Sequence, residues 1–119
     1  MNKHILVVED DADLGKIVVE ILHYSGFEVE HIRDGAAALE RLHTQMPDVL
    51  LLDLHLPTLS GDKLLEIIRA DEKLKDLKVV VMTADSYLAE SLVGKADRVY
   101  IKPLRIAAYD EIKLWLNVR

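Results

Sequence analysis

Side chains that could do chemistry together follow short apolar runs at four points of the 119-residue chain. Two acids follow the first run, and an acid, a hydroxyl and a lysine follow three later runs. In chain order these residues are Glu9, Asp10, Asp53, Thr83 and Lys102. Oxygen ligands in a chain without cysteine suit Mg²⁺, while an ammonium and a hydroxyl suit a phosphoryl group. The set predicts Mg²⁺-assisted phosphoryl transfer, in which one aspartate is the nucleophile and forms an acyl phosphate.

Each of these residues also has an ordinary structural explanation. The acidic run of residues 9–11 could complement the dipole at a helix N-terminus, and Thr83 could cap the helix that follows it. Lys102, with Pro103 after it, could be a solvated strand end. Asp53 ends a fully apolar run, so a simple loop cap explains it less well. The joint placement of the whole set at strand ends favours function.

The apolar runs have the length of strands, and helix-type stretches separate them. We expect strands over residues 5–8, 27–32, 49–52, 79–82 and 99–101, with 27–32 at a sheet edge because it alternates polar and apolar residues. A short helix is expected over 87–93, and Asp11 or Asp13 is expected to cap the first helix, which Gly26 ends. The residues expected to be buried on the other four helices are Leu14, Ile17, Val18, Ile21, Leu22, Ala37, Leu39, Leu42, Met46, Leu64, Leu65, Ile67, Ile68, Tyr109, Ile112, Trp115 and Leu116.

Five strands alternating with five helices predict an α/β fold with a parallel sheet covered on both faces. In such a sheet, ligands bind beyond the carboxyl ends of the strands. The acids, the hydroxyl and the lysine should therefore meet in one crevice. The end of the strand at 27–32, Arg33-Asp34, adds no obvious chemistry, and the histidines at 4, 23, 31 and 43 show no metal-ligand spacing.

Composition limits the classes of protein that fit. The 15 Lys and Arg against 21 Asp and Glu give a net charge of −6, which argues against nucleic-acid binding by this domain. The absence of cysteine excludes disulfides and thiolate metal sites, and no apolar run is long enough to span a bilayer. We expect residues 1–119 to form one soluble domain with a cytoplasmic location and no membrane contact.

The motifs resemble those of the response-regulator receiver domains of two-component signalling. They are residues 8–11, 53–57 with Ser60-Gly61, Thr83-Ala84 and Lys102-Pro103, and the resemblance covers residues 3–118. It implies a flavodoxin-like, doubly wound sheet of five parallel strands in the order 2-1-3-4-5 with five helices. It also implies a cis peptide bond between Lys102 and Pro103.

The resemblance assigns a role to each residue of the set. Asp53 would be the phosphoacceptor, Thr83 the hydroxyl that turns toward the phosphoryl group, and Lys102 its ion-pair partner. Mg²⁺ would be the cofactor. Its protein ligands would be Glu9 (through water), Asp10, Asp53 and the backbone carbonyl of His55.

Further positions concern tuning and switching. His55 and Asp85 stand two residues beyond Asp53 and Thr83, where family members flank the path of the attacking water. The switch aromatic of the family stands three residues before the lysine, and this chain has Val99 there, with Tyr100 one place later. Tyr100 should therefore project to the opposite side of the sheet. The stretch between Thr83 and Lys102 is also shorter than is usual in the family.

We interpret the chain as a phosphorylatable switch that is not a turnover enzyme, although it would promote phosphorylation and hydrolysis at Asp53. A histidine kinase or histidine phosphotransfer protein would be the donor. A downstream protein or an output domain outside this chain would be the partner, with a homodimer as a further option. The alternative is a phosphate-independent interaction module. A third reading, a small phosphatase or flavin protein, lacks the Gly-rich phosphate loop after the first strand.

Overall fold

The computed structural model describes residues 3–117 and shows five strands and five helices in alternation. The strands are β1 His4–Val8, β2 Glu28–Ile32, β3 Val49–Asp53, β4 Lys78–Thr83 and β5 Arg98–Ile101. The helices are α1 Ala12–Tyr24, α2 Gly35–Thr44, α3 Gly61–Ala70, α4 Ser86–Ser91 and α5 Ile106–Asn117. None of the helices within residues 3–117 is long and apolar enough to cross a membrane.

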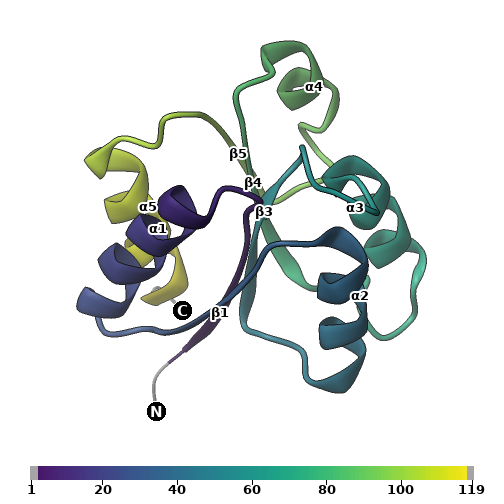
Figure 1. Cartoon of the computed structure of the whole chain (residues 1–119), viewed down its shortest axis with the longest axis horizontal. Coiled ribbons are helices and arrows are strands. Elements are labelled where there is room, and N and C mark those ends of the chain that lie inside the picture. The colour runs from purple at the N-terminus through teal and green to yellow at the C-terminus, as the bar shows by residue number, and fades with distance from the viewer. Residues whose placement is uncertain (1–2, 118–119) are drawn as a thin grey trace.

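The five strands form one parallel sheet in the order β2-β1-β3-β4-β5, as expected. α1 and α5 lie on one side of the sheet, and α2 and α3 lie on the other (Figure 1). Each side has its own core of buried residues: Leu50 and Leu52 point into one, and Val49 and Leu51 into the other. The central strands are apolar on both faces because both are covered by helices.

Helix ends follow local rules that the sequence already contains. Asp11 caps α1 by accepting a hydrogen bond from the N–H of Leu14 at 2.9 Å, which settles the choice between Asp11 and Asp13. Gly26 follows the C-cap of α1 with φ +99°, a left-handed conformation that glycine adopts at little cost. The predicted start and end of this helix are therefore confirmed.

Several predicted core positions are wrong. In α2, Ala38 is buried and Ala37 is exposed, because the cap at Asp34 sets the helix phase so that Gly35, Ala38 and Leu42 face inward. Met46 is 52% exposed because α2 ends at Thr44, so helical spacing no longer applies to it.

Two other predicted core residues lie at the border of their buried helix faces. Ile17 and Ile67 are 52% and 38% exposed, since each stands next to the buried stripe of its helix.

α4 is shorter than the predicted helix over 87–93, because it ends at Ser91 and Gly94 follows with φ +93°.

Candidate functional site

The carboxyl ends of the central strands carry buried polar side chains. Within residues 3–116, three polar residues are buried: Glu9, Asp53 and Thr83, with exposed fractions of 1%, 4% and 0%. They follow or end β1, β3 and β4, which are neighbours in the sheet. Burial of polar groups costs free energy unless they are paired, so their partners indicate what the site is built for.

Lys102 joins two of these carboxylates. Its Nζ lies 2.5 Å from Glu9 Oε1 and 3.1 Å from Asp53 Oδ2. The backbone N–H of Lys102 donates to the carbonyl of Thr83 at 2.8 Å. Lys102 therefore reaches across the sheet from the end of β5 to β3 and β1. The peptide bond that follows, Lys102-Pro103, is cis, as the resemblance implies.

Backbone N–H groups satisfy the remaining carboxylate oxygens. Asp11 donates its N–H to Glu9 Oε2 at 3.1 Å, and His55 donates its N–H to Asp53 Oδ1 at 3.2 Å. Each of the two carboxylates thus has one oxygen on Lys102 and the other on a main-chain donor. This arrangement orients both side chains before any ligand arrives.

Burial and hydrogen bonding shift the pKa values of Glu9 and Lys102. Burial raises the pKa of Glu9, although the hydrogen bond from Lys102 partly opposes the change. Burial alone would lower the pKa of Lys102, but its hydrogen bonds to Glu9 and Asp53 outweigh that cost and raise it above the ordinary value. The Lys102 ammonium is therefore held in its charged form.

Asp10 directly follows Glu9, His55 lies two residues beyond Asp53, and both residues are exposed. Within the described residues no three acidic or histidine side chains converge on one point. A site in which Asp10, Asp53 and the carbonyl of His55 would bind the cation directly, and Glu9 through water, does not need three converging side chains. Mg²⁺ keeps several waters in such sites. Glu9, Asp10, Asp53 and the carbonyl of His55 are oxygen donors that fit a hard divalent cation.

Comparison with known proteins agrees with this geometry. The family model described as the response regulator receiver domain matches residues 5–111. The chain belongs to this family. The receiver is 34% identical over 108 residues to the DNA-binding response regulator MtrA of Mycobacterium tuberculosis, an alignment covering 88% of this chain and 46% of MtrA. It thus spans about half the length of the curated relatives it matches.

Solved receiver structures superpose closely on this one. The response regulator TrrA from Thermotoga maritima, in complex with Mg²⁺-BeF, gives a TM-score of 0.86 at 29% identity and covers 96% of this chain and 98% of its own. A CheY-like receiver domain from Methylobacillus flagellatus gives 0.88 at 27% identity, with coverage of 98% and 100%. The predicted flavodoxin-like fold is confirmed.

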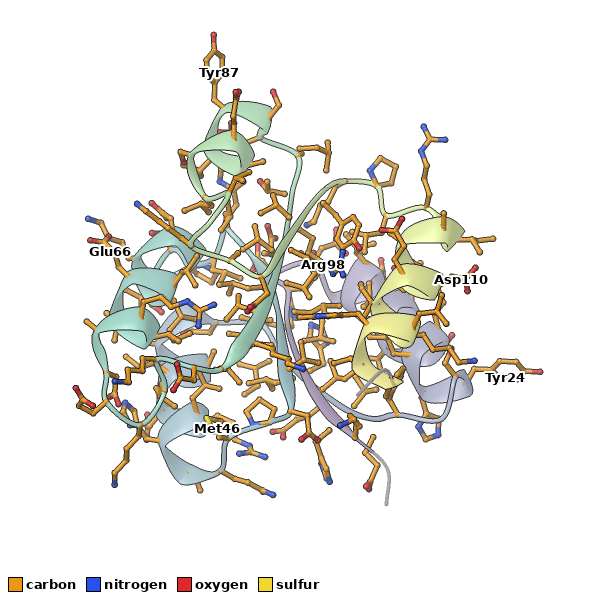
Figure 2. All side chains as sticks on the ribbon, turned by 180° about the vertical axis from the view of Figure 1, so that it is seen from behind. Tyr24, Met46, Glu66, Tyr87, Arg98 and Asp110 are labelled. Atoms are coloured by element: carbon orange, nitrogen blue, oxygen red, sulfur yellow. The ribbon has the colours of Figure 1, made fainter. Side chains whose placement is uncertain are left out.

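The loop after β4 connects the receiver's site to α4. Thr83 Oγ1 accepts a hydrogen bond from the N–H of Asp85 at 3.1 Å. Asp85, rather than Thr83, caps α4, because its Oδ1 accepts from the N–H of Leu88 at 3.0 Å. Asp85, which is predicted to tune hydrolysis of the phosphoryl group, is therefore also the N-cap of α4. Tyr87, which follows, is 89% exposed and points away from the receiver (Figure 2).

The two candidate switch residues on β5 face opposite sides of the sheet, as their alternation predicts. Val99 packs against the core shared by α2, α3 and α4, and Tyr100 packs against the core shared by α1 and α5. The Tyr100 hydroxyl donates to Glu111 of α5 at 2.8 Å. The one aromatic side chain of β5 is thus tied to α5 and does not face α4.

The structure also shows supporting contacts, near the end of β2, that the sequence analysis missed. His31 and Arg33 contact the backbone carbonyls of Glu9 and Asp10. Thr58, in the loop after β3, donates its hydroxyl to Asp34 at 2.6 Å. No signal in the sequence marks such contacts, because their partners are main-chain atoms or residues far along the chain.

Proposed function

We propose that this receiver accepts a phosphoryl group on Asp53 from a histidine kinase or a histidine phosphotransfer protein. The observation that carries the proposal is the position of Lys102, whose Nζ contacts both Asp53 and Glu9 at buried strand ends. A partly buried ammonium beside a nucleophilic carboxylate can pair with the charge of an incoming phosphoryl group. Family membership and the resemblance to TrrA, whose structure holds Mg²⁺-BeF, support it.

In the proposed reaction, a carboxylate oxygen of Asp53 attacks the phosphorus of phosphohistidine. The bond between phosphorus and the imidazole nitrogen breaks, and the imidazole takes a proton from solvent. Lys102 pairs with the phosphoryl oxygens and stays charged, while the Thr83 hydroxyl turns from its present partner, the N–H of Asp85, to the phosphoryl group. The domain would thereby assist its own phosphorylation and the hydrolysis of the phosphoryl group on Asp53.

Mg²⁺ is the proposed cofactor, held by Asp10, Asp53, the His55 carbonyl and, through water, Glu9. When bound, it would offset the negative charge that gathers around the phosphoryl group. The donor set consists of oxygen atoms only, which favours Mg²⁺ over metals that prefer nitrogen or sulfur.

We further propose that residues 1–119 act as one receiver domain in the cytoplasm. It would pass the signal to a downstream protein or to an output domain outside this chain, as the DNA-binding relative MtrA suggests. The loop of Thr83, Asp85 and Tyr87 is the proposed route to that partner, because it links the buried hydroxyl to the exposed side chain of Tyr87 on α4.

Intact-mass measurement after incubation with a small acyl phosphate and Mg²⁺ tests the proposal. The wild type should gain the mass of one phosphoryl group, and chelation of the metal should prevent the gain. Asp53→Asn should gain nothing, while Asp62→Asn, in the first turn of α3, is the matched control and should behave as wild type. An unmodified wild type would instead favour a phosphate-independent interaction module.

A further inference from the structure

The main chain of the acidic loop, residues 9–11, is held from the end of β2. His31 Nε2 lies 2.9 Å from the carbonyl oxygen of Glu9, and Arg33 Nε donates to the carbonyl of Asp10 at 2.8 Å. The N–H of Glu9 donates to the carbonyl of Ile32 at 3.1 Å. A carbonyl oxygen only accepts, so the Nε2 atom of His31 carries the hydrogen. The peptide groups on both sides of Asp10 are thereby fixed by His31 of β2 and by Arg33, which follows this edge strand.

A close contact with α1 holds the His31 ring in place. A Cβ atom added at Gly15 would lie 2.1 Å from His31 Cε1 and 2.3 Å from Nε2, so only a residue without a side chain leaves room for the ring. Glycine inside a helix costs about 1 kcal/mol relative to alanine, and α1 carries it at a buried position. The ring therefore packs directly on the backbone of α1.

These contacts matter because Glu9 and Asp10 are adjacent. Successive side chains of an extended chain point in opposite directions, so two neighbours can serve one ligand only if the main chain turns between them. Glu9 points inward to Lys102, whereas Asp10 is exposed. The hydrogen bonds to the carbonyls of residues 9 and 10 fix the peptide planes that decide where the two carboxylates point.

We propose that His31 and Arg33 are positioning residues that set the affinity of the acidic loop for a divalent cation. They touch neither the cation nor the phosphoryl group, and they act through the backbone of Glu9 and Asp10. The inference rests on the proposed function, because it assumes that the acidic loop binds Mg²⁺. Outer partners that orient metal ligands typically change metal affinity 10- to 100-fold when removed, although those partners usually contact the ligand side chain itself.

Calorimetric titration of the domain with MgCl₂ alone tests the role of His31. His31→Leu removes the donor and should weaken Mg²⁺ binding about tenfold. His31→Gln places an amide N–H near the position of Nε2 and should restore most of the affinity. His23→Leu, at an exposed position of α1, is the matched control and should bind as wild type. Equal weakening by Leu and Gln, or unchanged binding by His31→Leu, would overturn the role of the donor.

Gly15→Ala tests the same contact from the opposite side, because it displaces the ring and keeps the histidine. Alanine favours the helix, so thermal unfolding in chelator should show a folded domain. Affinity should fall by a factor similar to that of His31→Leu, and the double variant should lose nothing more. Losses that multiply in the double variant would show independent effects and overturn the assignment.

Variants of Arg33 distinguish the effect of its hydrogen bond from the effect of its charge. The distinction is needed because a guanidinium near the site should also repel a cation. Arg33→Gln keeps a donor at the place of Nε and removes the charge, so its affinity should equal or exceed that of the wild type. Arg33→Lys keeps the charge and moves the donor, so its affinity should fall several-fold. Wild-type binding by Arg33→Lys would overturn the positioning role of this side chain.

The experiment also distinguishes this inference from the proposed function. If the wild type binds no Mg²⁺ and takes no phosphate, the proposed function itself fails. If the wild type binds Mg²⁺, Asp10→Asn does not, and the His31 and Arg33 variants all match the wild type, only the positioning role fails.

Discussion

The two edge strands of the sheet reach the proposed phosphorylation site in different ways. β5 is followed by Lys102, whose ammonium contacts the carboxylates of Asp53 and Glu9 directly. β2 places no side chain in the site, and His31 and Arg33 instead bind the backbone that carries the acids. One edge thus supplies charge, and the other supplies position. A direct ion pair should dominate stability and reaction rate, whereas support through carbonyl groups should tune them.

The largest effect is expected at the β5 edge. Lys102→Met leaves the Glu9 and Asp53 carboxylates buried and without their shared counter-charge, so the free energy of unfolding in chelator should fall by about 3 kcal/mol. Denaturant unfolding measures the change, and Lys63→Met, at an exposed position of α3, is the control. Added Mg²⁺ should recover part of the loss. A loss no larger than that of the control would reverse the ranking of the two edges.

The second prediction concerns how β5 takes part in switching. Tyr100 is tied to α5 by Glu111, so it should not move with the loop after β4. We expect phosphorylation to change amide hydrogen exchange across residues 84–88 in the wild type and in a folded Tyr100→Ala variant, and not in Thr83→Ala. If Tyr100→Ala abolishes the change without unfolding, Tyr100 carries the switch despite its orientation.

Metal binding should give a smaller effect on stability, and this effect should depend on the loop that β2 supports. At Mg²⁺ about tenfold above Kd, the free energy of unfolding should rise by about 1.4 kcal/mol. The corresponding rise in Tm is about 5 °C for a domain of this size. Asp10→Asn should remove most of the rise in a thermal melt. An equal rise in that variant would exclude Asp10 from the cation site and weaken the role assigned to β2.

The smallest effect is expected just beyond β2, where Thr58 contacts Asp34. The Thr58 hydroxyl and the N–H of Ala37 lower the pKa of Asp34, so Thr58→Val should raise that pKa toward its ordinary value. A carboxyl whose pKa is lower in the folded state than in the unfolded state stabilises the fold at pH values above its unfolded pKa. This stabilisation is lost as the pH falls through the pKa of the folded state. The stability difference between wild type and variant should therefore shrink below about pH 4.

NMR titration of Asp34 measures the pKa, and denaturation at neutral and acid pH measures the stability difference. Thr44→Val is the matched control, since the Thr44 hydroxyl donates only to the carbonyl of Glu40 in its own helix. An unchanged pKa of Asp34 in Thr58→Val would show that the backbone N–H groups alone determine it.

The sequence by itself determined the alternation of strands and helices and the residues at the strand ends. Both depend on local order: a run of apolar residues forms a buried strand, and the polar residue that ends it lies at the sheet edge where parallel strands bind ligands. The positions of Asp53, Thr83 and Lys102 at that edge therefore follow from the order of residues alone. The opposite orientations of Val99 and Tyr100 followed from the alternation of side chains along a strand.

Only the tertiary structure decided which contacts support that site. The β1–β2 register pairs Val7 with His31, so the ring reaches the carbonyl of Glu9, 22 residues away in the chain. Asp85 became the cap of α4 because the chain turns there, and Ala38 replaced Ala37 in the core because Asp34 set the phase of α2. Every chain has main-chain carbonyls at every residue, so residue types do not reveal which of them a side chain will bind. That choice depends on strand register and helix packing.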